Sequence, residues 1–241
     1  MILLKKCDTY EEASKVASDV FVNAIKENPT ITLGLATGSS PLGIYKNLIE
    51  EYKSGNISFK NVKTYNLDEY VGISREHNQS YYYFMHDNLF NHVDINEDNV
   101  HVPYANPNNM DESCKEYSAL LNNTTVDIQL LGIGSNGHIA FNEPGTPFDQ
   151  ETFIVELTDK TRQDNKRFFN SIDEVPTHAI TMGIKNILNA KQIILIANGA
   201  NKAEAVKRLM SGEISEDFPA SALNNHPNVI VVVDKEAAKL L

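Results

Sequence analysis

Apolar residues along the chain follow two patterns, helical spacing and short uninterrupted runs. Positions that repeat every three and four residues predict amphipathic helices, as in the stretch from Tyr10 to Glu27. The other predicted helices cover Leu42–Lys53, Ser80–Phe90, Met110–Leu121 and Ala200–Met210. Short apolar runs predict buried strands over Ile31–Ala36, Val62–Leu67, Val126–Ile133, Ala179–Met182, Ile193–Ala197 and Val229–Val233. Strands and helices therefore alternate through most of the chain.

This alternation predicts an α/β fold: a single doubly wound, mostly parallel sheet with helices on both faces, of the Rossmann-like type. No linker, repeat or low-complexity segment divides residues 1–241, so we expect a single domain. The stretch Pro144–Asp173 has weak periodicity and mixed charge, and we interpret it as a lid-like excursion from the sheet. In such folds ligands bind beyond the carboxyl ends of the strands, where this chain places polar, glycine-rich segments. We expect these segments to converge on one cleft.

Composition and charge narrow the range of partners. The formal net charge is -11 and the sequence pI is about 5.1, so the surface repels nucleic acid and anionic membranes. An anionic substrate would therefore need a local cluster of donors. The two cysteines, Cys7 and Cys114, lack metal-site or redox spacing and are typical of a reducing compartment. Since no signal peptide or membrane span is found, we expect a cytoplasmic protein without nucleic-acid or membrane partners.

The first candidate binding segment is the turn Thr37–Ser40, which follows a predicted strand and precedes Pro41. Backbone N–H groups at a helix start, together with hydroxyl donors, make a site for phosphate, and Gly38 would let a ligand approach the backbone closely. An ordinary helix cap, with Ser39 or Ser40 as N-cap, explains the same residues equally well. The segment has neither the Gly-Lys-Ser/Thr ending of a Walker A loop nor the dinucleotide-binding fingerprint.

Two adjacent carboxylates, Asp68 and Glu69, follow the next predicted strand. A carboxylate at this place can act as a base for a proton next to a carbonyl, although a turn or capping aspartate is the commoner explanation of the pattern. Neighbouring residues on a strand point to opposite sides, so only one of the two should face the cleft. We take Asp68 as the candidate base.

The most informative segment runs from Leu130 to Pro144, where three glycines follow a buried strand and are themselves followed by His138 and Glu143. Glycines permit tight turns and close approach of the backbone to a ligand. A histidine titrates near neutrality, and a carboxylate within reach holds its tautomer and ring orientation, as in an acid–base relay. This combination favours function over a structural histidine in a turn. The aromatic run Tyr81–Tyr83, by contrast, is interpreted as helix packing.

Three stretches, Leu33–Pro41, Asn66–Gly72 and Asn136–Pro144, together resemble the glucosamine-6-phosphate deaminase family. The resemblance covers nearly the whole chain in the family's order and spacing. It implies the conversion of glucosamine 6-phosphate and water to fructose 6-phosphate and ammonia, with no cofactor and no metal. The related 6-phosphogluconolactonases share the fold and the Gly-His element but lack the Phe-Asn-Glu-Pro ending found at residues 141–144.

Matched position by position, the resemblance implies a role for each site residue. Asp68 matches the enolisation base, His138 the ring-opening histidine and Glu143 the glutamate that supports it. The residues that match the phosphate site are Thr37, Gly38, Ser39, Ser40, Arg167 and Lys202. Some members have an aspartate where this chain has Asn136. The amide cannot carry the charge that would raise the proton affinity of the histidine, but it can still hydrogen-bond and orient the ring.

Two alternatives to a deaminase stay open. One is a 6-phosphogluconolactonase-like sugar-phosphate hydrolase. The other is a non-enzymatic sugar-phosphate-sensing domain of a transcriptional regulator, which would need a DNA-binding segment and a basic surface. Larger, allosterically activated members of the family carry basic residues where this chain has Phe153–Glu156. The resemblance therefore implies a monomer or small homo-oligomer that is not controlled by an acetylated amino-sugar phosphate.

Overall fold

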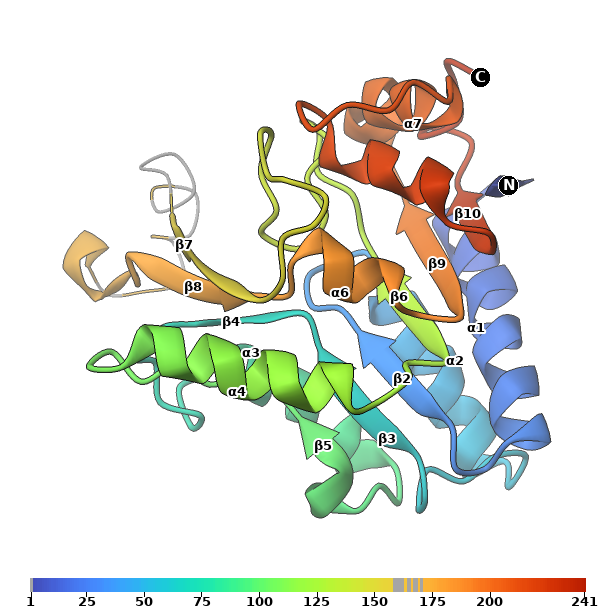
Figure 1. The fold of residues 1–241 in the computed structure, drawn as a ribbon. Helices are drawn as coiled ribbons and strands as arrows, with labels where there is room; N and C mark the ends of the chain where they lie inside the picture. Colours follow the sequence, from blue (N-terminus) through green and yellow to red (C-terminus); the bar gives the residue numbers. More distant parts are fainter. Residues whose placement is uncertain (1, 158–162, 164–165, 167–168, 170) are drawn as a thin grey trace.

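The centre of the fold is a sheet of seven strands in which every neighbouring pair is parallel (Figure 1). The computed structural model describes residues 2–157, 163, 166, 169 and 171–241. Across the sheet the strands are β1 (Ile2–Lys6), β10 (Val229–Val233), β9 (Gln192–Ala197), β6 (Ile128–Leu131), β2 (Thr32–Leu35), β3 (Lys63–Asn66) and β5 (Val100–His101). The predicted mostly parallel sheet is confirmed.

The chain changes its direction of travel across the sheet between β2 and β6. After β2 it adds β3 and β5 on one side, and after β6 it adds β9 and β10 on the other. Segments that leave neighbouring strands in opposite directions open a crevice at the carboxyl edge of the sheet. The segments after β2 and β6 therefore lie where an open α/β sheet binds its ligand.

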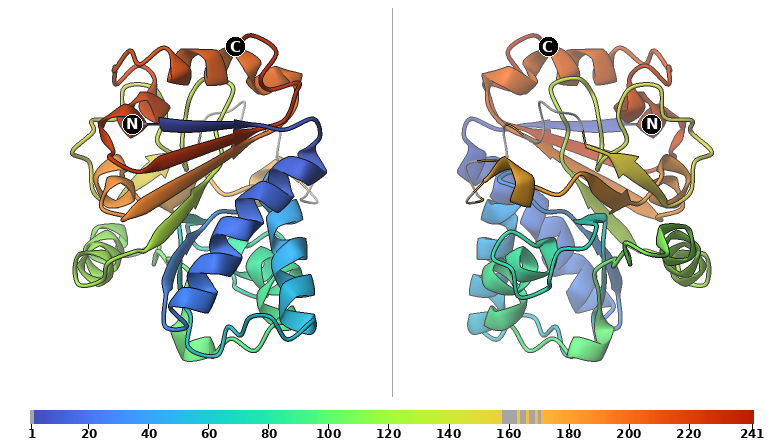
Figure 2. Two further views of the ribbon diagram at one scale, coloured as in Figure 1. Left: turned by 90° about the vertical axis from the view of Figure 1, so that its right-hand side faces the viewer. Right: turned by 90° about the vertical axis from the view of Figure 1, so that its left-hand side faces the viewer.

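Helices cover both faces of this sheet (Figures 1 and 2). On one face α1 (Tyr10–Glu27) and α2 (Leu42–Lys53) lie side by side, and α3 (Tyr81–Asn88) contacts α2. On the other face lie α4 (Met110–Asn122), α6 (Ile184–Leu188) and α7 (Ala203–Met210). The 3₁₀ helices are η1 (Phe90–His92), η2 (Glu97–Asn99), η4 (Ile172–Glu174), η5 (Ala200–Lys202) and η6 (Pro219–Asn225). Among the described residues, no helix combines the length and the apolar character needed to cross a membrane.

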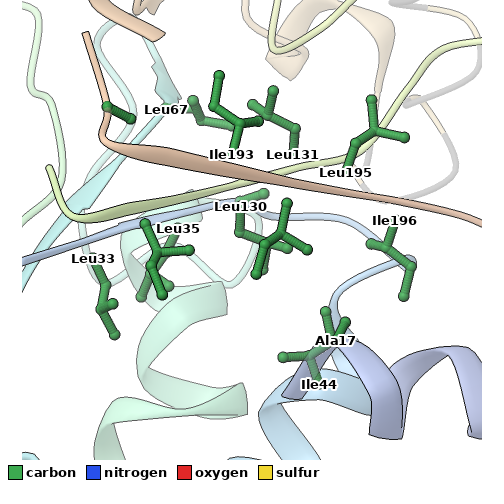
Figure 3. Packing of buried hydrophobic residues seen from close by; sticks show 14 of the residues in the cluster. Ala17, Leu33, Leu35, Ile44, Leu67, Leu130, Leu131, Ile193, Leu195 and Ile196 are labelled. Carbon is green, nitrogen blue, oxygen red and sulfur yellow. The ribbon is translucent and has the colours of Figure 1, made fainter. Parts of the chain in front are cut away.

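The core forms because side chains alternate between the two faces of the buried strands (Figure 3). Leu33 and Leu35 lie on one side with Ala17 of α1, whereas Leu131 and Leu195 lie on the other side. All five are fully buried. Burying one such leucine stabilises the fold by roughly 1.5–3 kcal/mol relative to leaving it exposed. Strands that are apolar on both faces therefore require helices on both faces.

A second, smaller sheet lies beside the first and was not predicted. It consists of β4 (Asp68–Tyr70), β8 (His178–Thr181) and β7 (Phe153–Glu156), with β8 in the middle and both pairings antiparallel. The predicted strand Ala179–Met182 thus belongs to the small sheet rather than to the central one. β4 follows β3 after a single residue, Leu67, so the chain passes directly from one sheet into the other. A three-residue strand is too short to show a periodic pattern.

The predicted lid overlaps this small sheet. β7 lies within the range 144–173 and pairs with β8, so part of the proposed excursion is regular structure. Residues 158–162, 164–165, 167–168 and 170 lie outside the described residues. Closure of a lid over the site stays a prediction, as does the single-domain assignment.

Candidate active site

The carboxyl edge of the central sheet contains a cavity of about 630 Å³ at the switch between β2 and β6. Its wall includes Thr37, Gly38, Ser39 and Ser40 after β2, Asp68 of β4, Gly132–Gly134 and His138 after β6, and Lys202 of η5. Segments distant in sequence therefore meet where the topology predicts a ligand. Seven of the ten site residues named from the sequence line this one cavity: Thr37, Gly38, Ser39, Ser40, Asp68, His138 and Lys202.

The turn from Thr37 to Ser40 forms one end of the cavity. Gly38 has a φ of +96°, a left-handed backbone that a side chain would strain. The N-cap residue of α2 is Pro41, which makes no side-chain capping hydrogen bond. The interpretation of Ser39 or Ser40 as an ordinary N-cap is therefore wrong. The Ser40 hydroxyl instead donates to the side-chain oxygen of Asn198, 3.1 Å away, which ties the turn to the loop after β9.

Lys202 enters the cavity from that same loop. Both carboxylate oxygens of Asp234 accept the backbone N–H of Gly199 at 3.0 Å and hold the loop in place. Partial burial lowers the pKa of the Lys202 ammonium. No carboxylate of a described residue lies within 4.0 Å of this ammonium, so its charge is available to an anion. Arg167, the other predicted cation, lies outside the described residues.

Asp68 and Glu69 point to opposite sides of β4, as strand alternation predicts. The Asp68 side chain lines the cavity, although the residue is only 7% exposed. Its carboxyl group has no hydrogen bond or ion pair with another described residue. Burial, with a smaller contribution from the charge of Glu69, raises the pKa of Asp68 from 3.8 to about 8. A carboxylate that is poorly solvated and unpaired is a strong base for its type.

Glu69 is buried on the far side of β4, where it anchors the start of α3. Its carboxylate accepts backbone N–H groups from Tyr70 at 2.8 Å, Tyr81 at 3.0 Å and Tyr82 at 2.9 Å. The Ser80 hydroxyl caps the same helix by accepting the N–H of Tyr83. Burial raises the pKa of Glu69, and the three N–H donors act in the opposite direction. Glu69 therefore fixes the cavity wall provided by α3 relative to the strand that carries Asp68.

His138 and Glu143 are adjacent, as the sequence predicts. The imidazole Nδ1 lies 3.2 Å from Oε1 of Glu143, without the alignment of a straight hydrogen bond. Contact with His138, followed by the Asn136 amide, lowers the pKa of Glu143 against the effect of burial. The ring packs over Gly134, where a Cβ would lie 2.4 Å from the imidazole Cε1. The glycine thus makes the room that the imidazole occupies.

Asn136 holds this pair through the glutamate rather than through the ring. Its side-chain NH₂ donates to Oε2 of Glu143 at 2.6 Å, and its side-chain oxygen accepts the backbone N–H of His138 at 3.2 Å. The Asn136 amide can therefore help to orient the His138 ring, as expected, but it does so through the Glu143 carboxylate and the His138 backbone rather than by contact with the ring. Nearby Ala140, which also lines the cavity, has a φ of +50°, a strained conformation of the kind found at functional sites.

Sequence reasoning missed the aromatic wall of the cavity. Tyr81, interpreted as packing, and Phe141 both line it, with ring centroids 6.3 Å apart. The Tyr81 ring also lies 5.0 Å from that of Tyr70. The feature of the sequence that could have placed Tyr81 in the cavity wall is its position at the start of a helix, soon after the carboxylates of β4. Within the described part of the chain, no three His, Cys, Asp or Glu side chains gather as a metal site would require.

Comparison with known proteins identifies the family of this chain. The family model for glucosamine-6-phosphate isomerases/6-phosphogluconolactonase matches residues 5–232. The glucosamine-6-phosphate deaminase of Thermoanaerobacter pseudethanolicus is 51% identical, over 96% of this chain and 92% of the relative. Glucosamine-6-phosphate deaminase 1 of Bacillus subtilis is 49% identical, over 98% of each chain.

Solved structures give the same result. A structure described as a monomeric glucosamine-6-phosphate deaminase is 48% identical, has a TM-score of 0.95 and covers 99% of this chain and 100% of its own. The 6-phosphogluconolactonase of Trypanosoma brucei has a TM-score of 0.81 at 20% identity, covering 100% of this chain and 99% of its own, and so shares the fold alone. The chain belongs to the glucosamine-6-phosphate isomerase/6-phosphogluconolactonase family.

Proposed function

We propose that this protein converts glucosamine 6-phosphate and water into fructose 6-phosphate and ammonia. The observation that carries the proposal is that one cavity contains a buried carboxyl group without a partner among the described residues, an imidazole paired with a carboxylate, and a turn with exposed donors. Relatives about half identical over nearly the whole chain are named glucosamine-6-phosphate deaminases, which supports the same assignment.

The phosphate binds at the Thr37–Ser40 turn and Lys202. Backbone N–H groups and hydroxyls of the turn donate to the phosphate oxygens, and the Lys202 ammonium supplies a charge that no described carboxylate neutralises. Arg167 completes this cluster in the proposal. Binding at the phosphate holds the sugar so that its reacting carbons lie toward Asp68 and His138.

His138 opens the sugar ring. The imidazole moves a proton between the anomeric hydroxyl and the ring oxygen, so that the pyranose becomes an open chain with an aldehyde at C1. Glu143 keeps the ring in one orientation and stabilises the imidazolium that forms during transfer, and Asn136 holds Glu143.

Asp68 then carries out the isomerisation. Its carboxylate takes the proton from C2, which the C1 carbonyl acidifies, and an enolamine forms. Returning a proton to C1 leaves an imine at C2. Water adds to that carbon and ammonia leaves, which produces the ketone of fructose 6-phosphate. The protein supplies two proton-transfer groups, each typically contributing about 10²–10⁴-fold.

A coupled assay for ammonia with glucosamine 6-phosphate tests the proposal directly. We expect ammonia release from glucosamine 6-phosphate and, in a separate assay that follows the acid formed by lactone hydrolysis, no turnover of 6-phosphogluconolactone. The reverse result would favour the hydrolase alternative, and no turnover with either would contradict an enzymatic function. We also propose a cytoplasmic protein that is a monomer or small homo-oligomer, which gel filtration with light scattering would measure.

A further inference from the structure

A tyrosine outside the cavity makes three hydrogen bonds around the turn that forms its phosphate end. Tyr10 begins α1, and its hydroxyl lies 3.1 Å from the carbonyl oxygen of Ser39 and 2.9 Å from that of Ser40. The same hydroxyl accepts the backbone N–H of Gly43, 2.8 Å away, in the first turn of α2. One phenolic oxygen therefore connects the first residue of α1, the end of the turn and the start of α2.

A second tyrosine holds the other end of the same turn. The hydroxyl of Tyr45, which is fully buried on α2, donates to the carbonyl oxygen of Ala36 at 2.5 Å and accepts the Ala36 N–H at 3.2 Å. Ala36 is the residue directly before Thr37. The four residues of the turn are therefore fixed on both sides by phenolic hydroxyls, and neither tyrosine forms part of the cavity wall.

The direction of these contacts matters for an anion. Tyr10 binds the turn from outside the cavity, so the carbonyl oxygens of Ser39 and Ser40 are held toward α1 and away from the ligand. A carbonyl oxygen turned into the cavity would repel phosphate, whereas N–H groups attract it. Among the described residues, no other hydrogen bond reaches these two carbonyl oxygens.

We propose that Tyr10 is a positioning residue that sets the affinity for the substrate's phosphate group by pre-organising the turn from Thr37 to Ser40. The inference rests on the proposed function, because it assigns the phosphate to this turn. Tyr10 acts through the turn and touches neither substrate nor reacting atoms. Its loss should therefore weaken phosphate binding and leave the proton transfers at the other end of the cavity unchanged.

The expected size follows from the contact that is lost. A neutral hydrogen bond typically contributes about 0.5–1.5 kcal/mol, which corresponds to roughly a 2- to 10-fold change in affinity. Tyr10→Phe removes one oxygen atom and keeps the ring. Tyr52→Phe is the matched control, since Tyr52 is also a partly buried tyrosine, on α2, whose hydroxyl has no hydrogen bond to a described residue.

The experiment measures binding of sorbitol 6-phosphate, which cannot react, by titration calorimetry, together with kcat and the unfolding temperature of each variant. We expect Tyr10→Phe to raise the Kd for sorbitol 6-phosphate and the KM for glucosamine 6-phosphate by the same 2- to 10-fold, with kcat unchanged. Tyr52→Phe should match the wild type in all measurements.

Three outcomes would overturn the proposal. They are an unchanged Kd in Tyr10→Phe, a loss of kcat as large as the loss of affinity, and a wild-type protein that does not bind sorbitol 6-phosphate. A wild type that binds sorbitol 6-phosphate but releases no ammonia would contradict the proposed function while the binding data still decide the role of Tyr10.

Discussion

Asp68 and Glu69 are neighbours on one short strand, both carboxylates are buried, and their surroundings differ completely. Glu69, 3% exposed, accepts three backbone N–H groups, whereas Asp68, 7% exposed, has no described partner and faces the cavity. The first arrangement favours an ionised group that holds structure together. The second leaves a carboxylate with unused basicity. Strand alternation thus gives two neighbouring carboxyl groups different positions, one inside the fold and one in the cavity wall.

The largest expected effect comes from removing the unpaired carboxylate. Asp68→Asn keeps the shape but cannot take the C2 proton, so we expect kcat to fall by about 10³–10⁴-fold. Asp87→Asn, an exposed aspartate on α3, is the control and should be fully active. Near-normal ammonia release by Asp68→Asn would refute its assignment as the base.

The pH dependence tests the same carboxyl group without a mutation. Only the ionised form is a base, and its pKa in the free protein is about 8. We therefore expect kcat/KM to rise about tenfold per pH unit below that value and to level off above it. A profile of kcat/KM that is flat from pH 6 to pH 8 would show that the active base is a group with a lower pKa.

Breaking the other carboxylate should damage stability more than chemistry. Glu69→Ala leaves one buried and two partly buried N–H groups without their acceptor, so we expect a loss of about 2–3 kcal/mol. For a chain of this size that lowers the unfolding temperature by roughly 4–12 °C. Glu116→Ala, at an exposed position of α4, is the matched control. If both variants unfold at the wild-type temperature, Glu69 does not anchor α3.

The last expected effect has the opposite sign. Because burial raises the pKa of Asp68 from 3.8 to about 8, ionised Asp68 opposes folding at every pH above 3.8, and the cost grows until about pH 8. Asp68→Asn removes that charge, so it should unfold at a higher temperature than the wild type at pH 8. The gain should shrink toward pH 5. Calorimetry that shows Asp68→Asn to be the less stable protein at pH 8 would contradict this account.

Local patterns were enough to predict five of the seven strands of the central sheet, whereas the edge strands β1 and β5 were not predicted. Helix α1 and strand β10 have the predicted bounds, because a long periodic helix and a β-branched run each carry a strong local signal. The orientation of Asp68 followed from strand alternation. The small sheet, the Tyr10 contacts and the aromatic wall depend on residues far apart in sequence, such as Tyr10 and Ser40, and no local pattern encodes those contacts.

The imidazole at the centre of the site has a consequence for how this sequence can vary. Gly134 has no space for even one methyl group beneath the His138 ring. Any substitution of Gly134 therefore displaces the His138 ring. We therefore expect positions 134 and 138 to vary together among relatives. A relative that has a side chain at position 134 should lack the histidine at position 138 and the proton transfer proposed for it.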